Sequence, residues 1–190
     1  MPAAIATDPL HATMALLKIL TYPNPILRQQ ATPVTTFDDE LKALVADMAE
    51  TMYDAPGVGL AANQVGVLKQ IVVIDITGSD AKEKDLIVLI NPRITNGEGE
   101  ETDEEGCLSV VEYTAKVKRF TKIQVEAQDI DGKPLNFTAE DFYARVIQHE
   151  VDHLNGHLFI DWISSLKRAL YKKKRKKQLE AELKKKTPVV

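Results

Sequence analysis

The residues with the clearest chemical potential are two histidines and a glutamate in the run QHEVDH at positions 148–153. His149 and His153 are four positions apart, so on a helix both imidazoles lie on one face, one turn apart. That spacing suits joint ligation of one divalent metal, with Glu150 beside it as a candidate base. A pattern with three fixed positions also arises by chance, so taken alone it leaves open an arrangement that binds no metal.

A metal held by two histidines needs further ligands, and the sequence offers several alternatives. The spacing of metzincin proteases would place a third histidine at position 159, which is Phe159 here. Thermolysin-like proteases take a glutamate from a later helix, where this chain has only Glu180 and Glu182 among lysines. His157 lies past the expected end of the helix. Cys107, in the run EGCLS at 105–109, remains a candidate, although a single cysteine is more often a small buried hydrophobe.

The helix that carries the histidines is expected to span residues 139–154. Thr138, followed three residues later by Asp141, resembles a capping box, and an Asn-Gly pair at 155–156 is a stop signal. Phe142 and Val146 fall on the same helical stripe as the two histidines. The metal would therefore face the domain interior, beside apolar side chains.

Hydrophobic spacing predicts the elements around this helix. A helix capped by aspartate is expected over 38–54, and β-branched runs predict strands at 71–74 and 86–90 on either side of a polar turn at 78–85. A strand over 120–128, an Asp-Gly turn and a return strand over 134–138 follow, and a Lys-rich helix over 163–186 comes last. This order predicts an α+β fold: mostly antiparallel sheets around the central metal-binding helix, plus a C-terminal helix.

Composition and charge indicate one globular domain with an appendage. The chain has 190 residues, of which 44% are hydrophobic, and its single cysteine excludes an internal disulfide. The net charge of -4 hides a split, because residues 167–190 hold 11 of the 24 basic residues and 2 of the 28 acidic ones. We expect a flexible extension over 1–13, a catalytic domain over 14–166 and a basic C-terminal helix or tail over 167–190.

The basic tail has two interpretations. It is either a solvated amphipathic helix, or a surface that contacts a polyanion such as RNA. In the first interpretation, four leucines supply its apolar contacts: Leu166, Leu170, Leu179 and Leu183. No apolar run approaches the roughly 20 residues that span a bilayer, and the N-terminus lacks the pattern of a secretory signal. Cytoplasm is therefore the expected compartment, with no membrane partner.

Three segments together carry a family resemblance. The runs GVGLAANQ at 57–64, EGCLS at 105–109 and QHEVDH at 148–153 resemble, in order, the three signature motifs of peptide deformylases. The resemblance extends from about Leu17 to Leu166. It implies a hydrolase that removes the N-formyl group from the initiator methionine of new bacterial-type proteins, and an α+β fold. It also implies formyl-Met nascent peptides as partners and a ribosome contact through the C-terminal helix.

The resemblance also implies the residues of the site. One divalent metal, usually Fe²⁺ with Zn²⁺, Ni²⁺ or Co²⁺ as substitutes, would be held by Cys107, His149 and His153. The metal would activate a water molecule, whose proton Glu150 would take and later deliver to the leaving amine. The side-chain amide of Gln64 and the backbone N–H of Leu108 would stabilise the oxyanion. The implied substrate contacts are Val58, Gly59, Phe142 and Val146.

The chain departs from common family patterns just after the cysteine motif. Val111 stands where many members have proline, and this chain lacks the arginine that many members have near the position of Thr114 and that helps them bind substrate. These departures concern substrate affinity and side-chain preference rather than metal chemistry. Arg119 receives no role from the sequence. The competing hypotheses are another HExxH metallohydrolase, such as a protease, and an inert ribosome-binding relative, which would have lost a ligand or a catalytic residue.

Overall fold

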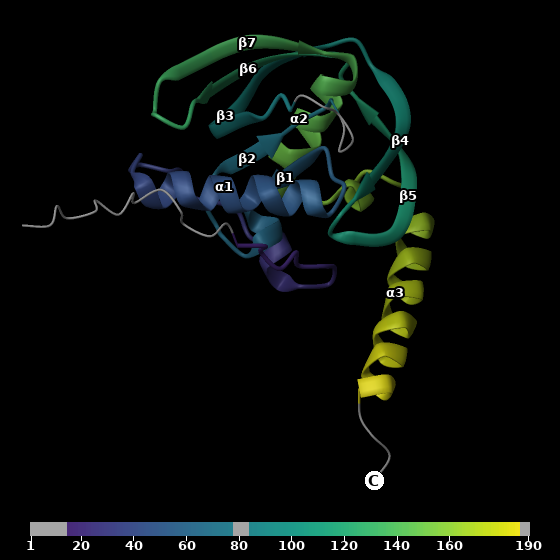
Figure 1. The fold of residues 1–190 in the computed structure, drawn as a ribbon. Coiled ribbons are helices and arrows are strands. Elements are labelled where there is room, and N and C mark those ends of the chain that lie inside the picture. Colours follow the sequence, from purple (N-terminus) through teal and green to yellow (C-terminus); the bar gives the residue numbers. More distant parts are fainter. Residues whose placement is uncertain (1–14, 78–83, 187–190) are drawn as a thin grey trace, which may run out of the picture.

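The computed structural model describes residues 15–77 and 84–186, and the extension expected over 1–13 lies outside them (Figure 1). Its α-helices are α1 (Asp39–Asp54), α2 (Asp141–Leu154) and α3 (Ser165–Lys186), with 3-10 turns η1 (Pro25–Arg28), η2 (Ala62–Val65) and η3 (Phe159–Asp161). Its strands are β1 (Gly59–Ala61), β2 (Ile71–Ile74), β3 (Ile87–Glu98), β4 (Glu101–Cys107), β5 (Val110–Arg119), β6 (Lys122–Gln128) and β7 (Pro134–Glu140). Within the described ranges, no helix is both long enough and apolar enough to cross a membrane.

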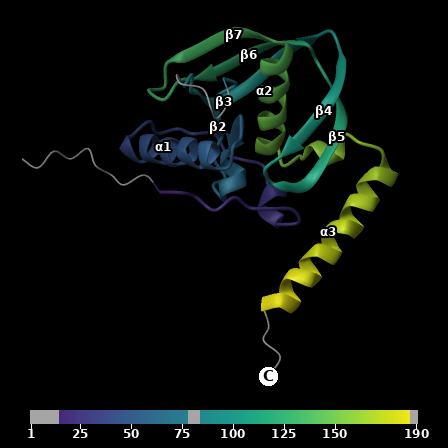
Figure 2. The ribbon, with the colours of Figure 1, turned by 45° about the vertical axis from the view of Figure 1, so that its right-hand side comes forward.

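Two antiparallel sheets enclose the helix that carries the histidines. One sheet has the strand order β1-β2-β3-β6-β7, and the other is the hairpin of β4 and β5. Figure 2 shows α2 between the larger sheet and this hairpin. A buried core, which includes Val72, Leu89 and Ile147, joins α2 to the larger sheet. The predicted α+β fold with a central helix and a C-terminal helix is confirmed.

Helix α1 confirms the helix expected over 38–54. The Asp38 side chain accepts a hydrogen bond from the backbone N–H of Leu41 at 2.9 Å, which satisfies one of the free donors at the helix start. Val45, Met48 and Met52 follow at helical spacing and are buried in a second core against β2. Their burial fixes α1 beside the sheet, just before the glycine-rich run that leads into β1.

The sheet differs from the sequence prediction in two places. Strand β3 does not end at residue 90 but runs to Glu98, because Asn91 adopts a φ of 53° and the register shifts there, so the strand bends instead of stopping. Strands β4 and β5 were not expected. The acidic run ETDEEGC of β4 has few typical strand residues, whereas β5 has several, including Val110, Tyr113 and Val117. Pairing supplies the missing stability, since Glu104 lies opposite Lys116 across the hairpin.

The capping box predicted for α2 is wrong. β7 continues to Glu140, so the helix begins at Asp141, and its N-cap makes no side-chain hydrogen bond. Thr138 instead accepts a hydrogen bond from Gln124 Nε2 at 2.8 Å, on the neighbouring strand. The stop signal is confirmed, because Gly156 has a φ of 76° and a Cβ there would lie 2.6 Å from the carbonyl oxygen of Arg28.

Helix α3 contacts the body through a different face from the predicted one. Leu166, Leu170 and Leu183 are 69%, 60% and 66% exposed, whereas Tyr171 and Arg175 are buried. The Tyr171 ring packs beside other aromatic rings, and the Arg175 guanidinium donates to the carbonyl oxygen of Tyr22, so these two side chains form the contact with the body. The predicted leucine face is therefore wrong for Leu166 and Leu170, whereas Leu179 is half-buried.

Candidate metal centre and active site

Three predicted ligands meet at one point of the interior. His149 and His153 lie on the buried face of α2, and their ring centroids are 5.1 Å apart. Cys107, the last residue of β4, places its Sγ 3.1 Å from Nε2 of His153. One ligand atom from each of the three residues lies within 4.8 Å of the others. The fold thus brings a cysteine together with two histidines that lie 42 and 46 positions after it in the chain.

This donor set fits a divalent transition metal. Nδ1 of His149 lies 3.0 Å from Oε2 of Glu105, an arrangement that leaves Nε2 of that ring for a metal. Burial lowers the pKa of His153 well below its ordinary value and so favours the neutral imidazole that a metal ligand requires. One thiolate and two imidazoles suit iron, zinc, nickel or cobalt rather than magnesium or calcium.

A buried carboxylate organises the surroundings of His149. Glu105 accepts hydrogen bonds from Arg119 Nε at 2.8 Å and Arg145 Nη1 at 2.9 Å. Arg119 also donates to Asp152 at 2.6 Å. Burial alone would raise the pKa of Glu105, but hydrogen bonds from His149 and Arg119 outweigh it and lower the value to about 2. Glu105 therefore stays ionised as the partner of the imidazole.

Sequence reasoning assigned no role to this carboxylate or its arginines. Glu105 was visible in the EGCLS motif, two residues before the cysteine, and a carboxylate near a metal-binding histidine is the usual outer partner. Arg119, which had no role, now has one: it holds Glu105 on one side and Asp152 on the other. Only the fold shows that these residues meet, because they come from β4, β5 and α2.

Glu150 faces the cavity side of α2 and is 4% exposed. Burial raises its pKa to about 7, against the opposing field of His149, so the carboxyl can exchange a proton near neutral pH. Its Oε2 has no hydrogen-bond partner among the described residues. A Cβ at Gly59 would lie 2.5 Å from Oε1, so only glycine leaves room for the carboxylate there.

The Gln64 amide has a fixed orientation. Its Oε1 accepts a hydrogen bond from the backbone N–H of Ala61 at 2.8 Å, and its Nε2 donates to Ser109 Oγ at 3.2 Å. Nε2 is also 3.7 Å from Cys107 Sγ, so the amide N–H group points to the metal ligands. Leu108 follows Cys107 directly.

One cavity of about 460 Å³ joins these residues. Its wall contains all four predicted substrate contacts, Val58, Gly59, Phe142 and Val146, together with Gln64, Cys107, Leu108, His149 and Glu150. Of the predicted site residues, only His153 is not part of this wall. The wall also includes residues that the sequence did not single out: Glu104, Glu112, Tyr113 and Arg145. Thr114, near the position of the family's arginine, lines it too and donates to Glu104.

A cysteine and two histidines beside a buried glutamate, at the wall of a partly apolar cavity, form the arrangement of a metal-dependent hydrolase. The family model described as polypeptide deformylase matches residues 16–169. A peptide deformylase of Desulfotalea psychrophila is 54% identical over 164 residues, which cover 86% of this chain and 97% of the relative. One of Rhizobium meliloti is 49% identical, covering 82% and 89%.

The solved structures agree with these relatives. A crystal structure of a peptide deformylase from Legionella pneumophila has a TM-score of 0.81 at 47% identity, covering 92% of this chain and 100% of that chain. One from Plasmodium falciparum also has a TM-score of 0.81, at 34% identity, covering 90% and 100%. The chain belongs to the polypeptide deformylase family, whose members are metal-dependent enzymes.

Proposed function

We propose that this chain removes the N-formyl group from N-formylmethionine at the start of newly made polypeptides and releases formate. We further propose that Cys107, His149 and His153 hold one divalent metal ion for this reaction. The supporting observation is the convergence of the three ligand atoms within 4.8 Å, beside a cavity whose wall contains Cys107, His149 and Glu150. When bound, the metal would polarise the formyl carbonyl group as a Lewis acid and would lower the pKa of water to near neutral.

The side chains of the chain provide the proton transfer. Glu150 takes a proton from the attacking water, whose oxygen bonds to the formyl carbon. The carbon becomes tetrahedral, and its former carbonyl oxygen becomes negative. The amide N–H of Gln64 and the backbone N–H of Leu108 stabilise that oxygen. Glu150 then gives its proton to the nitrogen of methionine as the carbon–nitrogen bond breaks, which leaves formic acid and a free amine. Formic acid then loses its proton to water and becomes formate.

The edge of the sheet provides the substrate site. β1 is an outermost strand of the five-stranded sheet, so an extended peptide can pair with its backbone at Gly59. Val58, Phe142 and Val146 then enclose the methionine side chain. Val146 is 5% exposed, whereas Phe142 is 53% exposed. The apolar floor and the more open rim suit a flexible, unbranched side chain.

A matched pair of variants tests the function. Wild type should release formate from a formyl-Met tripeptide, and Glu150→Ala should lower kcat about 100- to 10,000-fold, the range of general acid–base catalysis. The metal content should stay unchanged. Glu126→Ala, at an exposed carboxylate on β6, is the control and should retain full activity. Absence of formate from wild type, or full activity of Glu150→Ala, would refute the proposal.

We propose Fe²⁺ as the native metal, with Zn²⁺, Ni²⁺ or Co²⁺ able to replace it. The thiolate of Cys107 suits these ions, and it is also the group that oxygen can oxidise at an iron site. The iron-loaded enzyme should therefore lose formate-releasing activity in air faster than the nickel-loaded enzyme. Equal half-lives of the two forms in air would contradict this, and metal analysis after anaerobic purification would identify the native ion.

We also propose that the protein works in the cytoplasm and that α3 contacts ribosomal RNA, close to the emerging substrate. The exposed side chains of Lys172, Lys173 and Lys177 and the strong excess of basic residues in 167–190 support this contact. Replacing the three lysines by glutamine should weaken co-sedimentation with ribosomes in a salt-dependent way, and replacement by arginine should not. Unchanged co-sedimentation of the glutamine variant would refute the proposed contact between α3 and ribosomal RNA.

A further inference from the structure

Helix α3 contacts the wall of the active-site cavity. Glu112, near the start of β5, lines the cavity and has a φ of 51°, which is uncommon for a residue other than glycine. Lys174 Nζ donates to the backbone oxygen of Glu112 at 3.2 Å. Gln178 Nε2 donates to its carboxylate at 2.8 Å. Two side chains of α3 thus hold a backbone conformation that is sparsely populated without such support.

A row of aromatic rings makes a second connection. Tyr171 of α3 is 2% exposed, and its ring centroid lies 4.7 Å from that of Tyr113, which lines the cavity. Tyr113 stacks on Phe159 at 6.2 Å, and Phe159 stacks on His149 at 6.1 Å. The same buried cluster contacts Cys107. Close-packed rings transmit displacement, because each has little free space around it.

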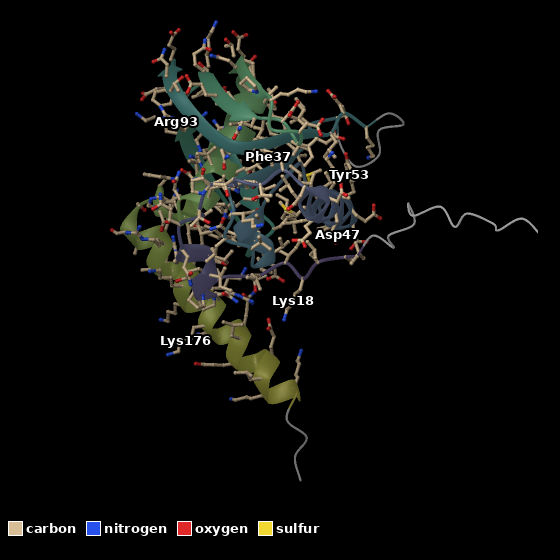
Figure 3. The ribbon with its side chains drawn as sticks, turned by 90° about the vertical axis from the view of Figure 1, so that its left-hand side faces the viewer. Lys18, Phe37, Asp47, Tyr53, Arg93 and Lys176 are labelled. Atoms are coloured by element: carbon tan, nitrogen blue, oxygen red, sulfur yellow. The ribbon has the colours of Figure 1, made fainter. Side chains whose placement is uncertain are left out.

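A third connection runs through backbone hydrogen bonds. Arg175 Nε donates to the carbonyl oxygen of Tyr22 at 3.0 Å, and the N–H of Tyr22 donates to the carbonyl oxygen of Ser109 at 2.8 Å. Ser109 Oγ in turn accepts the hydrogen bond from Gln64. The face of α3 that packs on the body therefore leads to Gln64 as well as to the cavity wall, whereas Lys176 points outward (Figure 3).

We propose that α3 positions the cavity wall: Lys174 and Gln178 hold Glu112, and Tyr171 holds Tyr113, in the arrangement that binds the formyl peptide. These α3 residues are positioning residues, since none of them lines the cavity. The inference rests on the proposed deformylase function. Its consequence is that anything that displaces α3, including a partner bound to its lysine-rich face, changes the affinity for substrate.

Steady-state kinetics on a formyl-Met tripeptide test this coupling. The double variant Lys174→Ala/Gln178→Ala should raise KM about 3-fold, the scale of one exposed ionic contact, with kcat and metal content within about 2-fold of wild type. The control Lys176→Ala removes the same charge from the outward face and should keep the wild-type KM. The single variant Lys174→Arg keeps Gln178 and retains a donor at position 174, so it should keep most of the wild-type affinity for substrate.

The outcomes separate the two proposals. If wild type releases formate and the double variant has the same KM as Lys176→Ala, the coupling is refuted and the deformylase function stands. If wild type releases no formate, both proposals fall. A further check is Tyr171→Phe, which keeps the ring contacts and should keep the wild-type KM. A several-fold rise in KM for Tyr171→Phe would show that the hydroxyl acts on the substrate by another route and would contradict the packing argument.

Discussion

Replacement of Glu105 by glutamine is the sharpest test of how the metal site is held. The carboxylate is 5% exposed and binds four donors: His149 at 3.0 Å, Arg119 at 2.8 and 3.0 Å, and Arg145 at 2.9 Å. Glutamine has nearly the same shape, but it has one acceptor oxygen and places an N–H₂ group against these donors. At least one buried cation or the His149 ring then loses its partner.

The magnitude follows from what each partner retains. Removing one member of a buried ion pair typically costs about 3–5 kcal/mol in the free energy of unfolding. Arg119 keeps Asp152, and Arg145 keeps the carbonyl oxygens of Val117 and Glu101, so the lower end, about 3 kcal/mol, is expected. At about 2–4 °C for each kcal/mol, Tm should fall by about 6–12 °C. His149 also loses its outer partner, which should weaken metal affinity about 10- to 100-fold.

Two measurements on the metal-loaded protein check these values. Denaturant unfolding gives the change in stability, and competition with a chelator gives the change in metal affinity. Glu101→Gln is the matched control, because it makes the same chemical change at an exposed side chain on the same strand. If Glu105→Gln unfolds within about 0.5 kcal/mol of this control and releases its metal no more easily, the role assigned to the carboxylate is wrong.

Three further predictions follow from single contacts. Gly59→Ala should nearly abolish formate release, because its Cβ would lie 2.5 Å from Glu150 Oε1; wild-type kcat/KM would contradict the tight approach. Gln64→Ala should lower kcat about 100-fold at near-constant KM, as expected for loss of one oxyanion donor, and a change in KM alone would refute that role. Burial by itself would raise the pKa of Asp161. Hydrogen bonding and charge attraction, chiefly from Arg28, act in the opposite direction and together outweigh burial, so the folded pKa lies below its ordinary value of 3.8. The ion pair thus stabilises the fold above that pH and loses this effect as pH falls through the lower folded pKa, so the stability gap between wild type and Asp161→Asn should close in acid. A gap that is constant with pH would contradict the assignment.

The elements that the sequence predicted correctly are those with local signals. The helix after Asp38 has a side-chain cap and apolar residues at helical spacing, and the end of α2 has a glycine that only a left-handed conformation suits. β4 had no such signal, since a strand of acidic residues becomes stable only beside its lysine-bearing partner, whereas β5 has the β-branched residues of a strand and was not predicted. The capping box predicted at Thr138 does not form, because the Thr138 side chain accepts a cross-strand hydrogen bond from Gln124 instead.

The candidate site divides in the same way. The i, i+4 spacing of His149 and His153 and the three ordered motifs were enough to predict the family, the three residues whose ligand atoms lie within 4.8 Å of one another, and residues that line the cavity. The tertiary structure alone decided that Glu105, Arg119 and Asp152 meet beside His149, and that Tyr171 and Arg175 rather than Leu166 and Leu170 face the body. Spacing along a chain determines which side chains share one face of an element. Which faces of different elements meet depends on the packing of the whole chain. The spacing of residues within one element does not specify these contacts.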